Sequence, residues 1–241
     1  MEHSRETSLV LRTCRADLTS RNGFQWAGVG GITVAPDWNA NEECGNGLHG
    51  WLYGGGDHSC SDYLSADAAW MVLEVVTADI IMLDGKCKFP RAKTVFVGGR
   101  KEAAESLLAN EPRSSNVKII GRIAEVGDSQ SLIGGALSVL TGGDGSTLTG
   151  GFRSTLTGGY GSTLTGGDHS TLTGGDCSTL TGGDQSTLTG GDGSELRIRY
   201  WDTKAERYRT AIAYVGENGI EANAAYRLDE SHQFVKAIIG N

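Results

Sequence analysis

The hydrophobic and polar positions of the chain follow two different patterns, one in each half. In the first 112 residues, short apolar runs rich in Val, Ile and Leu alternate with glycine and polar residues, and such runs are typical of β-strands. The runs lie at 9–14, 31–35, 70–76, 79–83 and 93–99. Residues 100–110 instead space Ala103, Ala104, Leu107 and Leu108 along one face of a helix. These patterns predict a compact α+β domain over residues 1–112.

From residue 126 the pattern changes to a period of eight. Nine octads with the consensus G-G-x-x-S-x-L-T cover 126–197, and the first and last octads, VGDSQSLI and GGDGSELR, depart most from it. A fixed short period is the signature of a repeat architecture, and degenerate terminal repeats are typical of units that cap the array. We therefore expect a β-solenoid over 126–197, with 113–125 as a connecting segment or a first strand.

Each octad is predicted to contribute one short strand and one corner. Ser-Thr-Leu-Thr is the strand, and Gly-Gly supplies backbone freedom for the corner. Alternation along a strand places Ser146 and Leu148 on the inner face and Thr147 and Thr149 on the outer face. One octad is too short to enclose a core, so two octads are expected to form each 16-residue coil.

The coil predicts two inner leucine ladders and a variable turn position. The ladders are Leu132, Leu148, Leu164, Leu180 and Leu196 on one side, and Leu140, Leu156, Leu172 and Leu188 on the other. The inward serines are expected to satisfy backbone groups at the corners. The fourth octad residue, for example His169, Cys177 or Gln185, is expected to lie on the turn surface at little energetic cost.

The C-terminal segment is predicted to be a β cap over 198–241. Residues 195–202 and 207–215 alternate as the two strands of a hairpin, and 219–239 predict two further short strands. Such a cap would cover the open hydrophobic end of the solenoid. Alternatively, a second copy of the chain covers the same end. This alternative predicts a homodimer through the solenoid or the cap.

Two sets of outward side chains recur along the octads. The threonine surface comprises Thr147, Thr149, Thr155, Thr157, Thr163, Thr165, Thr171, Thr173, Thr179, Thr181, Thr187 and Thr189. The acidic ladder comprises Asp144, Asp168, Asp176, Asp184 and Asp192. A calcium site and a turn-capping role are both open for these aspartates; turn capping is favoured because the calcium-binding repeat has a different period and Asp placement.

Charge and cysteine content limit the classes of function. A formal net charge of −8 disfavours an electrostatic nucleic-acid binder. Five cysteines without a C-x-x-C pair are an odd number, which suits free thiols in a reducing compartment, so a cytoplasmic location is expected. The polar N-terminus predicts no signal peptide, and no apolar run approaches the length of a membrane span.

The first domain offers weak candidates for chemistry. Cys44, His49, His58 and Cys60 are possible zinc ligands, but their spacings do not match those of structural zinc sites. The layout of His49, Tyr63 and Glu74 resembles ADP-ribosyltransferases, which implies NAD contacts for these three residues. Glu74 lies inside an apolar strand, however, and a structural role for His49 is favoured. The basic stretch KCKFPR (86–91) is interpreted as a solvated loop. No catalytic residue and no cofactor is assigned.

Two family resemblances bear on function. GGYGSTLT and its neighbours over 134–194 resemble the octapeptide of bacterial ice nucleation proteins, and that resemblance implies T-x-T rows that organise ice-like water. This chain has far fewer repeats, with three full T-x-T ranks on each face. GFQWAGVGG (23–31), APDWN (35–39), CGNGLHGWLYGGGD (44–57) and DGKCKFPR (84–91), together with AYVGENGIEANAAYRLD (213–229), resemble uncharacterised bacterial and phage-associated proteins.

These observations predict a non-enzymatic binding or scaffold protein, with a phage or prophage accessory role among the possibilities. The solenoid would be a rigid spacer or assembly surface. The partner is an unidentified protein or small molecule; nucleic acid and membrane are not expected. The alternatives are an NAD-linked enzyme in the first domain and an ice-binding protein that uses the T-x-T rows.

Overall fold

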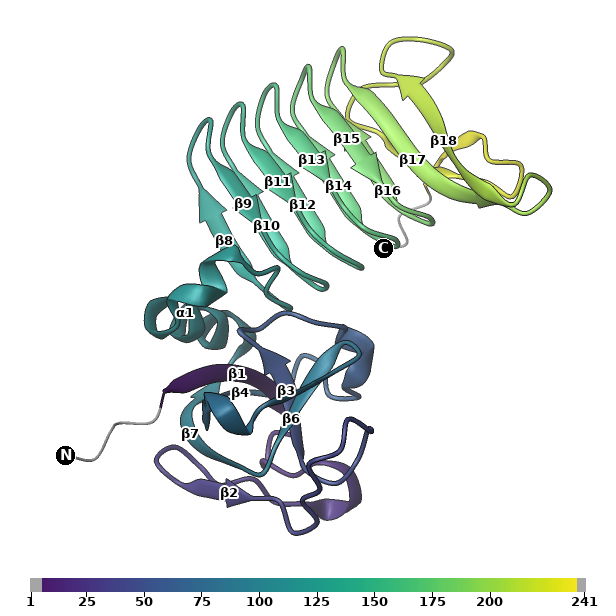
Figure 1. Ribbon diagram of the computed structural model, residues 1–241. Helices are drawn as coiled ribbons and strands as arrows, with labels where there is room; N and C mark the ends of the chain where they lie inside the picture. The colour runs from purple at the N-terminus through teal and green to yellow at the C-terminus, as the bar shows by residue number, and fades with distance from the viewer. Residues whose placement is uncertain (1–5, 238–241) are drawn as a thin grey trace. The chain divides into compact units, whose positions relative to one another are not determined.

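The computed structural model describes residues 6–237 and divides the chain into two compact units, 1–120 and 121–241 (Figure 1). Residues 1–5 and 238–241, the outer ends of the first and last predicted domains, lie outside the described residues. The first unit is built around one antiparallel sheet, and the second around two parallel sheets. All five cysteines are free thiols.

Seven strands form the sheet of the first unit, in the spatial order β2-β7-β4-β1-β3-β6-β5. They are β1 (Thr7–Cys14), β2 (Ile32–Val34), β3 (Leu48–Leu52), β4 (Ala69–Val76), β5 (Ile81–Leu83), β6 (Lys86–Phe89) and β7 (Arg91–Gly98). Every neighbouring pair is antiparallel. The central pair, β1 and β4, matches over the full length of both strands, from Thr7 opposite Val76 to Cys14 opposite Ala69.

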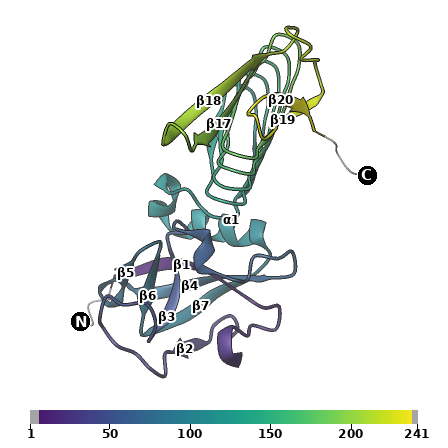
Figure 2. The same ribbon diagram turned by 90° about the vertical axis from the view of Figure 1, so that its right-hand side faces the viewer.

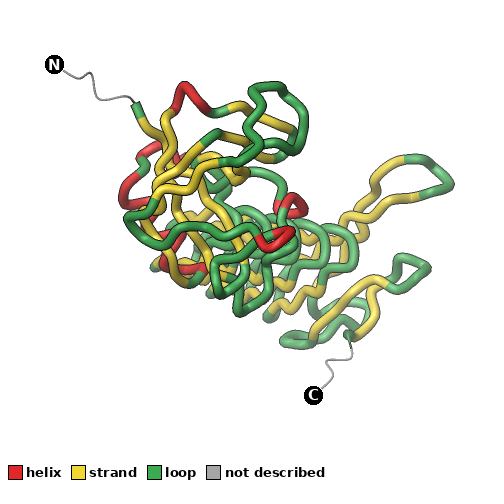
Figure 3. Tube along the Cα trace, turned by 90° about the horizontal axis from the view of Figure 1, so that it is seen from below, coloured by secondary structure: helices red, strands yellow, loops and turns green. Residues whose placement is uncertain are grey.

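The sheet buries apolar side chains on both faces. On one face, Val10, Met71 and Leu73 pack with Trp26 and Phe89. On the other face, the sheet packs against α1 (Arg100–Asn110) through Ala103, Ala104 and Leu107. Four short 3-10 helices lie in the connections: η1 (Arg21–Gly23), η2 (His58–Cys60), η3 (Thr77–Asp79) and η4 (Pro112–Asn116). The helical segments of the described chain therefore all belong to the first unit (Figure 3).

The five predicted strands of the first unit and its helix are confirmed, but the sequence analysis missed β3 and β6. The interpretation of 86–91 as a solvated loop is wrong, because Cys87, Lys88 and Phe89 are buried in β6. The Lys88 ammonium is satisfied by neutral acceptors: its Nζ donates to Asn41 Oδ1 at 2.7 Å and to the Glu43 carbonyl at 2.8 Å. Because Lys88 lies in a short run of mixed polarity, the sequence pattern did not indicate the buried strand β6.

The second unit is a β-solenoid in which successive octads alternate between two parallel sheets. One sheet contains β8 (Ile123–Val126), β10 (Val139–Gly142), β12 (Thr155–Gly158), β14 (Thr171–Gly174) and β16 (Thr187–Gly190). The other contains β9 (Ser131–Ile133), β11 (Thr147–Thr149), β13 (Thr163–Thr165), β15 (Thr179–Gly182) and β17 (Glu195–Asp202). From β8 to β15, each strand pairs in register with the strand 16 residues later, as Leu156 pairs with Leu172. Figure 2 shows the coils as flattened loops that lie one behind another.

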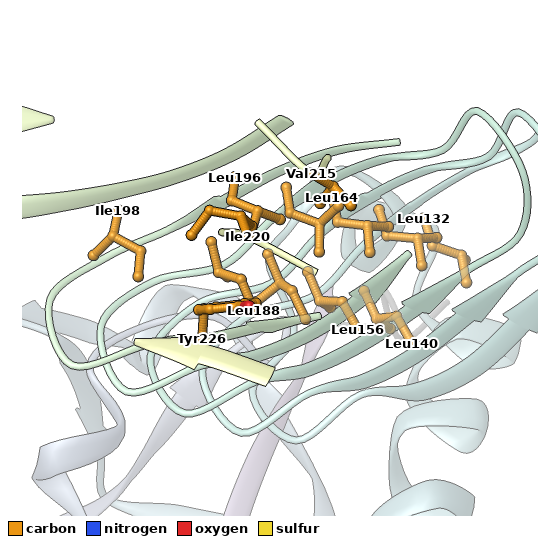
Figure 4. Close-up of a cluster of buried hydrophobic side chains, with 13 residues drawn as sticks. Leu132, Leu140, Leu156, Leu164, Leu188, Leu196, Ile198, Val215, Ile220 and Tyr226 are labelled. Carbon is orange, nitrogen blue, oxygen red and sulfur yellow. The ribbon is translucent and has the colours of Figure 1, made fainter. Parts of the chain in front are cut away.

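Both predicted leucine ladders are confirmed, and they fill the space between the two sheets (Figure 4). Leu140, Leu148, Leu156, Leu164, Leu172, Leu180, Leu188 and Leu196 are fully buried, and Leu132 of the first coil is 7% exposed. Complete burial of a leucine side chain contributes about 1.5–3 kcal/mol relative to exposure. The repeated leucine is therefore the main source of stability of the array.

The structure corrects the predicted role of Gly-Gly. Neither glycine of the pair has a positive φ; what the corner requires is space. A Cβ at Gly166 would lie 2.7 Å from Ser170 Cβ, and a Cβ at Gly167 would lie 2.8 Å from the backbone of Gly151 in the preceding coil. A side chain at the first glycine would displace the serine of its own corner, and one at the second would push neighbouring coils apart.

The left-handed backbone occurs instead at the variable fourth position of the octad. His169, Cys177 and Gln185 have φ of 58°, 58° and 56°, and Gly145 and Gly161 have 64° and 63°. A left-handed conformation costs a residue with a Cβ about 1–2 kcal/mol. The expectation that side chains at this position cost little is therefore wrong: this is the one octad position where glycine is favoured by the backbone conformation.

The predicted β cap is confirmed. β17 continues into a hairpin with β18 (Arg207–Tyr214), and β19 (Ala225–Leu228) pairs antiparallel with β16 and with β20 (Phe234–Lys236). The two hairpins extend the two solenoid sheets separately (Figure 3). Val215, Ile220 and Tyr226 join the leucine core of the last coil. Because the cap adds antiparallel strands to both sheets, neither β16 nor β17 is left as an open edge.

Candidate functional site

The interior of the solenoid holds a ladder of buried serines that satisfy the corners, as the sequence predicts. Ser162 is representative: its Oγ donates to the Gly159 carbonyl at 2.8 Å and contacts Ser146 Oγ at 3.2 Å. The backbone N–H of Ser162 donates in turn to Ser178 Oγ at 3.2 Å. Each serine thus links its own corner to the next coil, which makes the octad strand rigid and repeats its geometry.

The threonines of the same strands lie on the outside and form two arrays, one on each sheet. On the sheet of β11, β13 and β15, the rows are Thr147, Thr163, Thr179 and Thr149, Thr165, Thr181. On the sheet of β12, β14 and β16, the rows are Thr155, Thr171, Thr187 and Thr157, Thr173, Thr189. Threonines lie about 4.8 Å apart along a row, and the two rows of one face lie about 6.7 Å apart.

The threonine hydroxyls are free to bind solvent or a ligand. All twelve side chains are exposed or half-exposed. None of the twelve hydroxyls has a hydrogen-bond partner among residues 6–237, whereas the buried serines beside them are bonded. Each array is therefore a regular lattice of methyl groups and of hydroxyls without protein partners, on a rigid backbone.

The arrays are bounded by different residues at their two ends. Thr141 extends one row by a further rank, because it pairs with Thr157. The sequence analysis missed Thr141 because its octad has valine at the other threonine position. At the far end, Glu195 and Arg197 follow Thr179 and Thr181 in register and form an ion pair at 2.7 Å. A charged pair thus ends that array at the cap.

The predicted acidic ladder has a structural role in the described coils. Asp168 Oδ1 accepts the backbone N–H of Asp184 at 2.9 Å, and Asp176 Oδ1 accepts that of Asp192 at 2.9 Å. Asp144 Oδ1 accepts the N–H of Tyr160 at 2.8 Å. These three carboxylates therefore cap turns of the next coil, whereas Asp184 Oδ1 accepts the N–H of the adjacent Gln185 at 3.0 Å. Asp128, which the sequence analysis left out of the ladder, caps Asp144 in the same way.

The structure does not bring the three catalytic candidates of the first unit together. His49, on β3, lines a cleft with Arg12 and Trp26. Tyr63 lines a second cleft, beside Arg15, and Glu74, on β4, lines a third, beside α1 and Arg113. Burial and the neighbouring cations Lys86, Arg12 and Lys88 lower the pKa of His49 to about 4. His49 is therefore a neutral imidazole at pH 7.

The four metal candidates do not converge either. Cys44 is exposed, His49 is on β3, and His58 and Cys60 lie on η2. Within residues 6–237, no three His, Cys, Asp or Glu side chains lie close enough together to hold a metal ion. The same residues contain no helix that is long and apolar enough to cross a membrane.

The fold and surface define a class: a β-solenoid protein with a separate sheet domain at its N-terminal side. Residues 8–108 match a family described as a domain of unknown function, DUF7666. The chain is also similar to ice nucleation proteins. That of Pseudomonas syringae is 40% identical over 110 residues, which cover 44% of this chain and 9% of that protein. That of Pseudomonas fluorescens is 37% identical over 118 residues, which cover 46% and 10%.

The ice nucleation protein of Xanthomonas campestris pv. translucens is 37% identical over 111 residues, or 44% of this chain and 7% of that protein. The resemblance of the octads to ice nucleation repeats is therefore confirmed. The chain nevertheless spans only about a tenth of the length of these curated relatives. No solved structure matches the chain.

Proposed function

We propose that the chain is a non-enzymatic binding and scaffold protein whose solenoid is a rigid display surface, and that its threonine arrays bind ordered water at the surface of ice. The observation that carries the proposal is the set of twelve outward threonine hydroxyls without partners among residues 6–237. The similarity to ice nucleation proteins supports the same surface. The sheet domain would add a second binding function.

A flat parallel sheet suits this role because its side chains cannot rearrange independently. The serine and leucine ladders inside fix each strand at its spacing, so the hydroxyls and methyls outside keep a two-dimensional register. A surface that is already ordered loses little conformational entropy when it binds an ordered ligand.

The size of the arrays sets the expected activity. Three full ranks per face give an array about 10 Å tall. Such an area can adsorb to an existing ice crystal but is too small to template a new one. We therefore expect inhibition of ice recrystallisation, without a change in the freezing temperature of droplets that contain the monomer.

The experiment compares recrystallisation inhibition by the native chain and by a variant with Thr155→Leu, Thr157→Leu, Thr171→Leu and Thr173→Leu. Leucine keeps the strand pattern but removes the hydroxyls and alters the spacing of surface groups, so inhibition by this face should be lost. The control carries Thr203→Leu, an exposed threonine outside the octads. An inactive native chain, or equal activity of the two variants, contradicts the proposal.

A second candidate function is assembly through the cap. The outer face of the β17–β18 hairpin exposes Trp201, Tyr208, Ile212 and Tyr214 by 47–56% each. Exposed apolar side chains that gather on one face mark interaction surfaces. We propose that this face binds a second copy of the chain. Light scattering of the native chain and of Trp201→Ser/Ile212→Ser tests self-association, and a monomer for both excludes the homodimer.

A further inference from the structure

The sheet domain contains a cleft of about 350 Å³ that the proposed ice-binding surface does not use. Arg12, Trp26, Leu48 and His49 line it, together with Phe24 and the rim residues Arg21 and Asp37. A volume of this size lies at the lower end of small-molecule sites. The cleft is therefore large enough for a small organic ligand.

Three of the sequence stretches quoted in the sequence analysis converge on this cleft. GFQWAGVGG (23–31) supplies Phe24 and Trp26, APDWN (35–39) supplies Pro36 and Asp37, and CGNGLHGWLYGGGD (44–57) supplies Leu48 and His49. These stretches lie in different loops and strands of the sheet domain. Their meeting at one concavity is what a binding site assembled from separate segments requires.

Arg12 lines the cleft and lacks an anionic partner. Its Nη1 donates to the His49 carbonyl at 3.0 Å, and its guanidinium lies 4.9 Å from the ring centroid of Trp26. No carboxylate among residues 6–237 lies within ion-pair distance of it, and its Nε is buried without a hydrogen-bond partner. Burial also lowers the pKa of Arg12. Arg12 is half-buried, so the fold removes part of this cation from water without supplying an anion, and that desolvation opposes folding.

His49, which also lines the cleft, shares this feature of a buried nitrogen without a hydrogen-bond partner. Its Nε2 is also buried without a partner. A smaller cavity of about 10 Å³, close to the size of one water molecule, lies against both residues. Of the four buried side-chain atoms without partners in the described chain, two therefore lie at this one site.

The charges and apolar groups around the cleft indicate the class of ligand. Arg12 and Arg21 contribute positive charge; Arg21 is already paired with Asp62 at 2.7 Å, and Asp37 is the acidic group at the rim. Phe24 and Trp26, in edge-to-face contact at 5.7 Å, form an aromatic wall with Leu48. A guanidinium is suited to bidentate contact with carboxylate or phosphate, and aromatic side chains pack against flat rings.

We propose that the cleft binds a small organic anion, with its carboxylate or phosphate on the Arg12 guanidinium and a flat body against the aromatic wall. The site is independent of the solenoid surface. The bound ligand would then provide the negative charge that Arg12 lacks in the fold, which gives the unpartnered guanidinium a role in binding.

The test uses benzoate and phenyl phosphate as probes, with benzyl alcohol as the neutral match and inorganic phosphate as the anion without a ring. Binding to the full chain is followed by saturation-transfer NMR and by the indole N–H signal of Trp26, which donates to Ser20 Oγ at 3.1 Å. We expect at least one aromatic anion to bind at millimolar concentration, at least tenfold more tightly than benzyl alcohol, and to shift that signal. If no anion binds, or if all four probes bind equally, the proposal is wrong.

Variants separate binding from folding. Arg12→Met should weaken anion binding at least tenfold and raise the melting temperature of the ligand-free chain, because an apolar side chain removes the unpaired cation and its buried Nε without a partner. The matched control is Arg122→Met in the second unit, whose Nε is also buried without a partner; it should leave binding unchanged. If Arg12→Met does not fold, Arg12→Lys takes its place in the test. Lysine keeps the positive charge but lacks the paired N–H donors of the guanidinium, so anion binding should weaken. Unchanged affinity in a folded Arg12 variant overturns the assignment.

Discussion

The solenoid and the sheet domain treat buried polar groups in opposite ways. In the octads, each inward serine has partners in its own corner and in the neighbouring coil, as Ser162 has with Gly159 and Ser178. In the sheet domain, Arg12 and His49 each bury a nitrogen without a partner. Repetition explains the first result, because one satisfied arrangement is copied in every coil. The second result marks a site where the folded chain leaves buried nitrogen atoms without hydrogen-bond partners.

The comparison teaches where to look for function in each unit. In the solenoid the interior is complete, so the exposed threonine arrays are the part left for binding. In the sheet domain the incompletely satisfied groups lie in a cleft, so binding is expected inside the concavity. One unit presents an outer lattice, and the other an inner pocket.

The largest expected effect comes from breaking the leucine ladder. Leu164→Ala removes a fully buried side chain between two neighbouring coils, and such changes cost about 2–5 kcal/mol of unfolding free energy. Urea unfolding followed by circular dichroism measures the loss. Thr163→Ala, one residue away on the outer face, is the control and should change stability by no more than about 0.5 kcal/mol. Equal effects would show that the octad alternation does not determine stability.

A smaller effect is expected from the serine ladder. Ser162→Ala removes the hydrogen bonds that the Ser162 hydroxyl makes with the Ser146 hydroxyl and with the Gly159 carbonyl, which should cost about 1–3 kcal/mol. Ser131, an exposed serine of β9 that is in register with the outward Thr147, gives the control Ser131→Ala. If Ser162→Ala costs no more than the control, the contrast in polar satisfaction between the two units does not hold.

The sheet domain should lose stability in acid because of His49. Its pKa in the folded chain is about 4, below its ordinary value of 6.5, so the unfolded chain takes up a proton that the folded chain excludes. The contribution is fully present above about pH 6.5 and is lost as the pH falls from there towards 4. Unfolding free energies from pH 8 to pH 4 measure the slope, which should flatten in His49→Gln and persist in the exposed His169→Gln.

The smallest effect concerns the fourth octad position. Gln185→Gly should stabilise the solenoid by about 0.5–1 kcal/mol, because Gln185 has a φ of 56° and glycine adopts this conformation without a steric cost. The reverse change, Gly161→Gln, should destabilise it by a similar amount. Both are read from unfolding midpoints, and changes of the same sign would contradict the backbone argument.

The octads were predictable because their information is local and repeated. Ser162 and Leu164 face inward and Thr163 outward, as alternation requires, and in-register stacking follows from identical neighbours. The sequence could not reveal that the glycine pair is required for close approach and that the variable residue has the left-handed φ. Both depend on the distance to the neighbouring coil and on the path of the corner, which only the assembled stack determines.

For the sheet domain, the sequence by itself determined five of the seven strands and the helix at 100–110, because each has an apolar pattern of its own. Only the tertiary structure decided that Lys88 is buried, since its acceptors come from residues 41 and 43 in a distant loop. The same holds for the cleft: Arg12, Trp26 and His49 meet through strand order and loop packing, and their spacing along the chain contains no trace of it.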